Sequence, residues 1–313
     1  MNIAYLISAH TDAPQLARLI KALHPDAEFF VHIDKKSDIR PFKAHMNAKN
    51  VHFIGEKDKN SPYTGKRIDV RWGTLIEVEY QMELLKAAIY HPRHFDHIFF
   101  LSGMDYPLWS NERITQWLEA QGDREILQGI NMNTPYIKGQ QYKLYTLSRP
   151  LFRLFSNKWN QRLSIVCRKA LEIIGHRKDL SIKIKYGQWN LYKGSAWWCI
   201  SEDLARYVVD TYKQSPEIRR YFSDSFGQAE TVIQTIAFNS PKWAPRCIFT
   251  KGEYPGLDAL TPLHFIIYDP VIKVMTAEDL PAMKASGRMF ARKFRSGISD
   301  GVIRLINEER KKA

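Results

Sequence analysis

The stretch IAYLISA at residues 3–9, followed by FFVHID at 29–34, decides the fold of this chain. Both runs are apolar until their last residues, which is typical of strands buried in a sheet. Between them, Leu16, Leu19 and Ile20 recur at the spacing of one helix face. This order predicts a β-α-β unit with parallel strands, whose polar residues gather at the carboxyl ends, where open α/β sheets bind ligands.

The alternation of strand and helix continues to about residue 130. VHFIG at 51–55 predicts a third strand, the apolar face of 74–90 predicts a helix, and HIFFLSG at 97–103 predicts a fourth strand. Such alternation indicates an α/β protein with a Rossmann-like, mostly parallel central sheet flanked by helices. Residues 1–130 are therefore expected to form the nucleotide-binding half of the chain.

The rest of the chain divides by composition. Residues 131–186 form a basic, aromatic-rich insertion that we interpret as loops and helices packed on the sheet, with solvated charged faces over apolar ground. A dedicated acceptor site or a membrane site is the alternative. Residues 187–313 are expected to form the acceptor and catalytic half and end in a basic segment. Because no repeat or clear linker separates these parts, we expect one domain over residues 1–313.

Patterns in this last part predict further elements. They are a strand in SAWWCIS at 195–201, helices over 202–213 and 228–239, a strand in LHFIIY at 263–268, and a basic helix at the tail.

The composition is that of a globular protein with a large surplus of positive charge. Its 46 Lys and Arg residues exceed its 33 Asp and Glu residues, which gives a formal net charge of +13. Such a surplus attracts phosphates, acidic glycans or an anionic membrane surface. A nucleic-acid partner is disfavoured, because the basic residues are spread along the chain without a zinc-finger, homeodomain or RNP signature.

Cysteine content and hydropathy bear on location. Three widely spaced cysteines suit a reducing compartment better than a disulfide framework. The N-terminus lacks the basic start of a signal peptide, and no apolar run approaches the roughly 20 residues that span a bilayer. We therefore expect a cytoplasmic protein, with a peripheral contact to the inner face of the membrane as one option.

The candidate proton acceptor is Glu230. Transfer of a sugar to a hydroxyl needs a nucleotide site, positive charge for the departing diphosphate and a carboxylate that takes the hydroxyl proton. In SFGQAETVIQTIAFN at 225–239, Glu230 falls in the first turn of a predicted helix, whose positive end favours an ionised carboxylate. The alternative is that Glu230 is only a favourable first-turn acid.

The candidate diphosphate ligands lie in GRMFARKFRSG at 287–297. If this segment is helical, Arg288, Arg292 and Lys293 fall within about two turns, and the neighbours Arg292 and Lys293 point about 100° apart. A basic tail with a solvated face is the alternative. No Asp-x-Asp occurs in the chain, so these cations rather than a metal ion are expected to bind the diphosphate.

Five further residues are candidates for contacts with the nucleoside, the sugar or the acceptor. His10 and Asp34 end the first two strands, where a uracil and a ribose would lie. Trp197 and Trp198 would face opposite sides of a strand, so that one belongs to the core while the other stacks on a sugar ring. Asp105 follows a buried strand and is a candidate acceptor of sugar hydroxyls, although a turn-stabilising role is equally ordinary.

Seven motifs in series carry a resemblance to a known family. They are IAYLISAHTD, FFVHIDKKS, VRWGTLIEVEYQMELLKAA, FFLSGMDYPL, KGSAWWCIS, QAETVIQTI and MFARKF, spread over nearly the whole chain. In this order they resemble the Core-2/I-branching β-1,6-N-acetylglucosaminyltransferase family, glycosyltransferase family 14, which also contains the peptide O-xylosyltransferases. The resemblance implies a GT-A type fold, an inverting mechanism and a UDP-sugar donor used without a metal or other cofactor.

The resemblance also implies roles for single residues. Glu230 matches the family's catalytic base, although the Pro-Asp that precedes it in the family reads Gln228-Ala229 here. His10 and Asp34 match strand ends that contact UDP in the family.

The basic end of the chain matches the family in part. Lys293 matches a residue that contacts the UDP diphosphate. Trp72 lies in the family's Trp-Gly segment before a helix and is a candidate for contact with the sugar or the acceptor. His264 stands where the family pattern has an arginine, so Arg288 or Arg292 is expected to compensate.

Together, the residues and the resemblance predict an inverting, metal-independent glycosyltransferase from a bacterium. The expected reaction moves N-acetylglucosamine or xylose from a UDP-sugar to a hydroxyl of a glycan or lipid-linked glycan, in the synthesis of surface polysaccharide or lipooligosaccharide. The alternative is a non-catalytic carbohydrate- or nucleotide-binding protein on the same fold.

Overall fold

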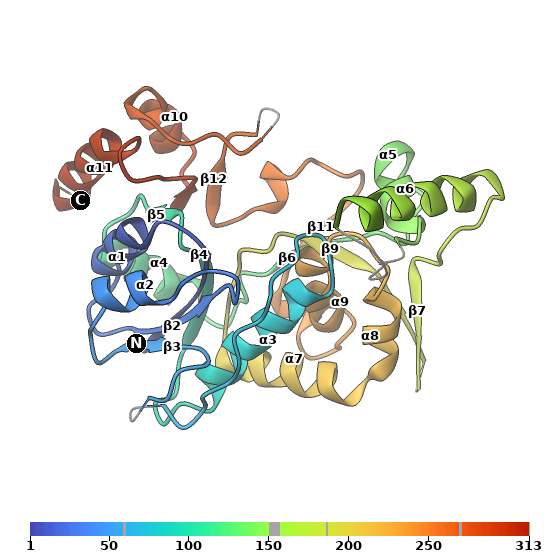
Figure 1. Cartoon of the computed structure of the whole chain (residues 1–313), viewed down its shortest axis with the longest axis horizontal. Coiled ribbons are helices and arrows are strands. Elements are labelled where there is room, and N and C mark those ends of the chain that lie inside the picture. Colours follow the sequence, from blue (N-terminus) through green and yellow to red (C-terminus); the bar gives the residue numbers. More distant parts are fainter. Residues whose placement is uncertain (59–60, 150–156, 186, 269–270, 313) are drawn as a thin grey trace.

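The computed structural model describes residues 1–58, 61–149, 157–185, 187–268 and 271–312 of the chain. Figure 1 shows the central strands close to the N-terminus with helices on both sides, and α5 and α6 at the far edge of the molecule. Among the helices in these ranges, none is both long enough and apolar enough to cross a lipid bilayer.

The elements in the described ranges have the following bounds. The helices are α1 (Ala13–Ala22), α2 (Arg40–His45), α3 (Ile76–Ile89), α4 (Asn111–Gln121), α5 (Gly139–Thr146), α6 (Asn157–Ile173), α7 (Glu202–Gln214), α8 (Pro216–Phe222), α9 (Val232–Phe238), α10 (Leu280–Ala285) and α11 (Asp300–Lys312). Short 3-10 turns are η1 (Gln228–Glu230), η2 (Ala244–Arg246), η3 (Asp258–Leu260) and η4 (Ala277–Asp279). The strands are β1 (Ile3–Ala9), β2 (Glu28–Ile33), β3 (Val51–Phe53), β4 (His97–Ser102), β5 (Asp105–Pro107), β6 (Gln128–Asn131), β7 (Ser181–Ile184), β8 (Gly187–Asn190), β9 (Tyr192–Gly194), β10 (Cys199–Ile200), β11 (Ile248–Thr250), β12 (His264–Ile266) and β13 (Phe290–Arg292).

Within the described residues, the central sheet has the strand order β10-β4-β1-β2-β3. β1 to β4 pair in parallel, and the short β10 runs antiparallel beside β4. Ser8 near the end of β1 pairs with His32 of β2 on one side and Ser102 of β4 on the other. The predicted α/β class with a mostly parallel central sheet is confirmed, and the carboxyl ends of these strands meet at one edge.

Alternating side chains of β1 separate two hydrophobic clusters. Ala4 and Leu6 pack in the cluster that contains α3, α7 and α9. Tyr5 and Ile7 pack in the cluster that contains α1 and α4. Because successive strand residues point to opposite faces, α3 and α7 cover one face of the sheet and α1 and α4 cover the other.

A smaller sheet, β12-β13-β5, lies next to the carboxyl edge of the central sheet. β5 directly follows β4, and β13 pairs antiparallel with it so that Arg292 lies opposite Asp105. A third hydrophobic cluster, which includes Phe294 and Ile303, packs α11 against this sheet. The C-terminal part of the chain is thereby brought to the carboxyl edge of the central sheet.

Most predicted elements are confirmed with small shifts at their ends, namely β1 to β4, α3, α7, β12 and the tail helix α11. The predicted helix over 287–297 is wrong, because Phe290–Arg292 is a strand that pairs with β12 and β5. The predicted helix over 228–239 is interrupted at Thr231. Glu230 therefore ends a 3-10 turn just before α9.

In the described part of 131–186, helices α5 and α6 lie apart from the central sheet. Figure 1 places α5 and α6 beyond β9 and β11, on the side away from β1 to β3. Tyr145 of α5 is buried in the same cluster as α9, whereas Trp159 and Val166 of α6 are each 61% exposed. The prediction that this segment covers apolar ground with solvated charged faces is wrong for α6, which turns apolar side chains to solvent.

Candidate active site

The ends of β1 and β2 bring His10 and Asp34 to one edge of the sheet. Ala9 pairs with Ile33, and the Asp34 backbone N–H donates to the Ala9 carbonyl at 2.9 Å. The Ser37 hydroxyl donates to the His10 carbonyl at 2.7 Å. The prediction that both residues follow neighbouring strand ends is confirmed, and their contact with UDP stays a prediction.

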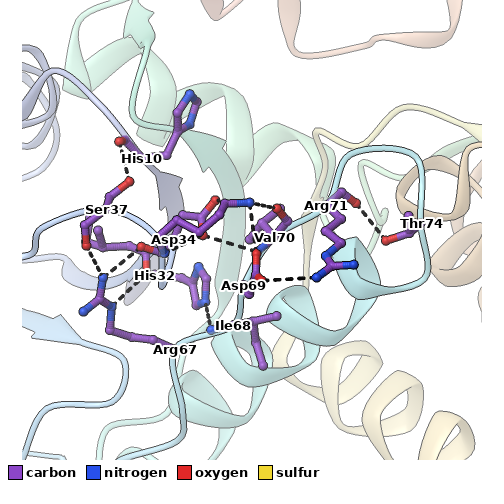
Figure 2. A network of polar contacts seen from close by, with 12 residues as sticks. His10, His32, Asp34, Ser37, Arg67, Ile68, Asp69, Val70, Arg71 and Thr74 are labelled. Atoms are coloured by element: carbon purple, nitrogen blue, oxygen red, sulfur yellow. Dashed lines mark hydrogen bonds and ion pairs between the residues drawn. The ribbon is translucent and has the colours of Figure 1, made fainter. Parts of the chain in front are cut away.

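The Asp34 carboxylate fixes the loop before α3. Its Oδ1 accepts from the Lys36 N–H at 3.0 Å and from the Val70 N–H at 3.3 Å, and its Oδ2 lies 3.4 Å from Lys36 Nζ. The Arg67 guanidinium donates to the Asp34 carbonyl at 2.8 Å, as Figure 2 shows. Because Asp34 is only 8% exposed, these contacts make it the residue that holds the loop over 66–74 against β2.

This loop carries Trp72, which is 83% exposed. The next residue, Gly73, has a φ of 71°, a left-handed conformation that favours glycine, and it turns the chain into α3. An exposed indole on a fixed loop can stack on a sugar or base. Its contact with a substrate stays a prediction.

Cationic side chains lie around His10. The charges of Arg292, Lys293 and Lys36 all act on its ring, against the opposite charge of Asp34. The pKa of His10 lies below its usual value, because partial burial and the three cations lower it more than Asp34 raises it. Positive charge gathered at the carboxyl ends of parallel strands suits a diphosphate.

Arg292 and Lys293 are neighbours with different partners. Arg292 Nη1 donates to Asp105 Oδ1 at 3.0 Å across the β13–β5 pair. Burial lowers the pKa of Lys293, and the charges of Arg292 and Arg295 lower it further. Lys293 therefore offers an ammonium group that forms no ion pair with any carboxylate in the described part of the chain.

Asp105 holds Arg292 and His264 from inside the protein. Its Oδ2 accepts from the Ser102 N–H at 2.7 Å and lies 3.1 Å from His264 Nε2. Burial opposes ionisation, but His264 and Arg292 outweigh it, so the pKa of Asp105 lies below its usual value. The prediction that Asp105 contacts a sugar is wrong, because the residue is 0% exposed and its carboxylate is occupied by protein partners.

The two adjacent tryptophans separate as expected, one toward the site and one into the core. Trp197 lies 5.2 Å from the guanidinium carbon of Arg292 and 5.2 Å from the ring centre of His264. Trp198 is 0% exposed and stacks on Phe100 at 5.4 Å. A sugar contact by Trp198 is therefore wrong, because its indole is enclosed by the core.

Arg288 lies at the other end of β13. It stands two residues before the first strand residue, Phe290, whereas Arg292 is the last residue of the strand. The Arg288 guanidinium donates to the Pro262 carbonyl at 2.8 Å. The prediction that Arg288 and Arg292 lie within two turns of one helix is wrong, because the strand puts them at opposite ends, and the contact of Arg288 with a diphosphate stays a prediction.

Glu230 is paired with a buried lysine. Its carboxylate forms a close ion pair with Lys193 of β9, whose side chain is 4% exposed against 28% for Glu230. Lys193 Nζ also lies 5.5 Å from the ring centre of Tyr145 and 5.8 Å from that of Tyr254. Burial opposes the charge of Lys193, but Tyr145, Glu230 and Tyr254 outweigh it and raise its pKa. Lys193 is thus a permanent cation that orients Glu230.

Glu77 is a site residue that sequence reasoning misses. It lies in the first turn of α3, and its Oε2 accepts from the Gly73 N–H at 2.7 Å. Burial raises the pKa of Glu77 to about 7; the Gly73 hydrogen bond opposes this rise, and the charge of Glu230 adds to it. Its signal in the sequence is its position, an acid in the first turn after Trp72-Gly73.

We call Glu77 and Glu230 the acidic pair, and Arg292 and Lys293 the cationic edge. Tyr80 relates the two, because groups from both act on it. It lies one turn after Glu77 on α3, its hydroxyl interacts with Ser8 at the end of β1, and the charges of Glu77 and Arg292 both act on it. The acidic pair and Arg292 therefore lie around the start of α3, on one side of the sheet.

One group of side chains in the described ranges could hold a metal ion. The ligand atoms of Glu28, His52 and His91 lie within 4.8 Å of one another. His52 Nε2 is 2.8 Å from Glu28 Oε2, and its other nitrogen contacts Asp58. Glu28 begins β2 whereas Asp34 follows its end, so this group lies away from the site edge. Transfer without a metal stays a prediction.

The fold and the site together define a class of protein. A mostly parallel α/β sheet with charged side chains gathered at its carboxyl edge is the arrangement in which α/β enzymes bind their ligands. The family model described as Core-2/I-Branching enzyme matches residues 3–255. The chain belongs to the Core-2/I-branching enzyme family, which is a family of glycosyltransferases, and the resemblance read from the motifs is confirmed.

Known relatives and solved structures add context. The chain is 26% identical over 248 residues to xylosyltransferase 2 of Rattus norvegicus, covering 77% of this chain and 25% of that protein, and 26% identical over 247 residues to the Homo sapiens protein, with the same coverage. It thus spans about a quarter of the length of the curated relatives it matches. Core-mannan synthase A from Aspergillus fumigatus is similar at a TM-score of 0.35 and 9% identity, covering 79% of this chain and 72% of that one. The score is too low to carry an argument about function.

Proposed function

We propose that this protein is an inverting glycosyltransferase that uses a UDP-sugar and transfers the sugar to a hydroxyl of a glycan. The observation that carries the proposal is that the charges of Glu230 and Arg292 both act on the first turn of α3, Glu230 on Glu77 and Arg292 on Tyr80. Membership of the Core-2/I-branching family supports the same reaction class.

In the proposed donor site, Lys293 and Arg292 bind the diphosphate and His10 and Asp34 lie at the nucleoside end. Arg292 is fixed by Asp105, while Lys293 has no carboxylate partner among the described residues. Positive groups held in place before the reaction stabilise the charge that develops on the leaving diphosphate without reorganising. With this pair in place, and with no Asp-x-Asp in the sequence, we propose that transfer does not need a metal ion.

In the proposed chemical step, Glu230 takes the proton of the acceptor hydroxyl. The hydroxyl oxygen bonds to the anomeric carbon on the face opposite UDP. The bond between that carbon and the β-phosphate oxygen breaks, and its electron pair leaves with UDP. Attack from the opposite face inverts the anomeric configuration. Lys193 holds Glu230 in one orientation, and Trp197 and Trp72 are the proposed stacking surfaces for the sugar or acceptor.

The finer assignment is N-acetylglucosamine or xylose as the sugar. N-acetylglucosamine is proposed because of the resemblance to the family's N-acetylglucosaminyltransferases, and xylose because of relatives named xylosyltransferases. A glycan or lipid-linked glycan is the proposed acceptor, in surface polysaccharide or lipooligosaccharide synthesis in a bacterial cytoplasm. The net charge of +13 supports anionic substrates and surfaces of this kind.

A panel of UDP-sugars tests the proposal. Each donor is incubated with the protein in EDTA and then with added Mn²⁺, with free UDP as the readout and calorimetry for affinity. We expect UDP release with UDP-N-acetylglucosamine or UDP-xylose and no gain from Mn²⁺. Tight UDP binding without release from any donor would instead favour the non-catalytic binding protein.

A further inference from the structure

Helix α6 carries an apolar stripe that faces solvent. Trp159 is 61% exposed, Val166 is 61% exposed and Ile173 is 84% exposed, with Leu163 and Ala170 at the positions between them. The alternating spacing of four and three residues places all five within about 80° of one helix face. Figure 1 shows α6 at the edge of the molecule, with no other element drawn beyond it.

The adjoining face of α6 is the one turned to the protein. Ser164, Cys167, Arg168 and Leu171 are only partly exposed, and Leu163, which is also partly exposed, lies at the boundary between this face and the stripe. The apolar stripe therefore lies on the outer face of the helix. A surface helix normally turns its apolar face to the core, so a stripe oriented outward indicates an external partner.

Cations flank this stripe. Arg162 and Lys169 are exposed and lie seven residues apart, so both fall on the same flank of the stripe. The Arg162 guanidinium lies 5.2 Å from the ring centre of Trp159. Exposed Arg177 follows the helix. A tryptophan, aliphatic side chains and flanking cations are the features of a helix that lies in the interface of an anionic membrane.

Charge complementarity distinguishes a membrane from a second copy of the chain. Two copies packed antiparallel along their stripes would bring their cationic flanks together, in a protein that already carries +13. Anionic lipid headgroups would instead neutralise Arg162 and Lys169 while the acyl region receives Trp159 and Val166. We infer that α6 docks this protein on a phospholipid surface that contains anionic lipid.

Docking by α6 would place the candidate base near the bilayer. α5 precedes α6 in the same segment, and its Tyr145 contacts Lys193, the partner of Glu230. A lipid-linked acceptor would then reach the site from the membrane plane. This placement of the acceptor rests on the proposed function, whereas the docking of α6 does not.

Vesicle co-sedimentation tests the docking with the full-length protein and no substrate. We expect binding to vesicles of phosphatidylcholine mixed with phosphatidylglycerol, little binding to phosphatidylcholine alone, and release by salt. Val166→Ser with Ile173→Ser should weaken binding at least about tenfold, because two exposed apolar side chains no longer enter the bilayer. Arg162→Gln with Lys169→Gln should weaken it about fivefold per cation.

A matched control carries Val271→Ser and Leu305→Ser, two apolar residues that are 68% and 38% exposed elsewhere on the surface. This variant should bind vesicles like the wild type. Circular dichroism shows that each variant is folded, and UDP release without vesicles should be equal in all of them. Equal binding by the control and the α6 variants, binding without anionic lipid, or a concentration-dependent dimer without vesicle binding would each overturn the inference.

Discussion

The cationic edge, Arg292 and Lys293, and the acidic pair, Glu230 and Glu77, have the same arrangement of side chains but opposite charge. At the cationic edge, Arg292 is fixed by a buried partner, Asp105, and Lys293 beside it has only cations acting on it. In the acidic pair, Glu230 is fixed by the buried Lys193, and the charge of Glu230 acts on Glu77. Each region thus combines one anchored charge with a second of the same sign that the described protein residues leave unpaired.

The two regions differ in depth, and this difference indicates their roles. Asp105 is 0% exposed, so Arg292 is anchored from within the core, as a rigid diphosphate site requires. The Lys193–Glu230 pair is less enclosed, because the side chain of Glu230 keeps 28% exposure. A carboxylate that must receive a proton from an incoming hydroxyl needs such access.

Replacing Glu230 should have the largest effect on activity. Glu230→Gln keeps the shape of the side chain and removes the proton acceptor, so turnover should fall by about 10³-fold, the size of general-base contributions. UDP affinity, measured by calorimetry, should stay within about twofold, because the cationic edge is intact. If Glu230→Gln keeps near wild-type activity, Glu230 is not the base, and Glu77 is the next residue to test.

Replacing Asp105 should have the largest effect on stability. Asp105→Asn leaves Arg292 without its buried counterion, which costs about 3 kcal/mol of unfolding free energy. Because the pKa of Asp105 is lowered in the folded state, its contribution is present above the unfolded value of about 4 and is lost as pH falls. Urea unfolding curves of wild type and variant should therefore differ at pH 7 and converge in acid. A constant difference at all pH values would contradict the ionised Asp105.

These contacts mark the limit of what sequence can predict here. Periodicity finds β1, β2, β4 and α3, because each buries a repeating apolar face. It fails at 287–297, because β13 is a short strand with basic residues around it and forms by pairing with β5, a segment far away in the chain. The enclosure of Asp105 and the separate positions of Arg288 and Arg292 depend on that pairing, so the sequence alone does not predict them.

Partners far apart in the sequence explain the remaining misses in the same way. Lys193 and Glu230 come from different elements, and the pKa of Glu77 is raised first by burial and then by the charge of Glu230, both of which arise in the folded protein. Glu230, His10 and the two adjacent tryptophans could be singled out from local motifs. Their surroundings could not, since burial and charge at a site come from tertiary packing.

Replacing Lys293 should have an intermediate effect on donor affinity. Lys293→Ala removes a cation that forms no ion pair with a carboxylate in the described ranges, so UDP affinity should fall about tenfold, the size of one charged hydrogen bond. Arg288→Ala, at the other end of β13, is the matched control and should leave UDP affinity unchanged. If Arg288→Ala weakens UDP binding more than Lys293→Ala does, the diphosphate lies near Arg288 and the proposed donor site is contradicted.

Glu77 should have the smallest effect, visible mainly as a change in pH dependence. As pH rises through about 7, Glu77 ionises and places a second negative charge at the position where the proton of the acceptor hydroxyl is removed. Wild-type turnover should therefore rise through this range, whereas Glu77→Gln should give a flat profile that equals wild type at low pH and falls about threefold below it above the transition. The control Glu79→Gln changes a neighbouring acid that bonds the Tyr212 hydroxyl instead, and it should keep the wild-type profile.

Stability gives an independent readout of the same group. Because burial raises the pKa of Glu77 from 4.5 to about 7, the folded protein keeps this proton to higher pH than the unfolded chain does. The free energy of unfolding should then decrease as pH rises between these two values, and Glu77→Gln should remove that decrease. If the slopes of wild type and variant coincide while their activity profiles differ, Glu77 acts through the acceptor rather than through its own titration beside Glu230.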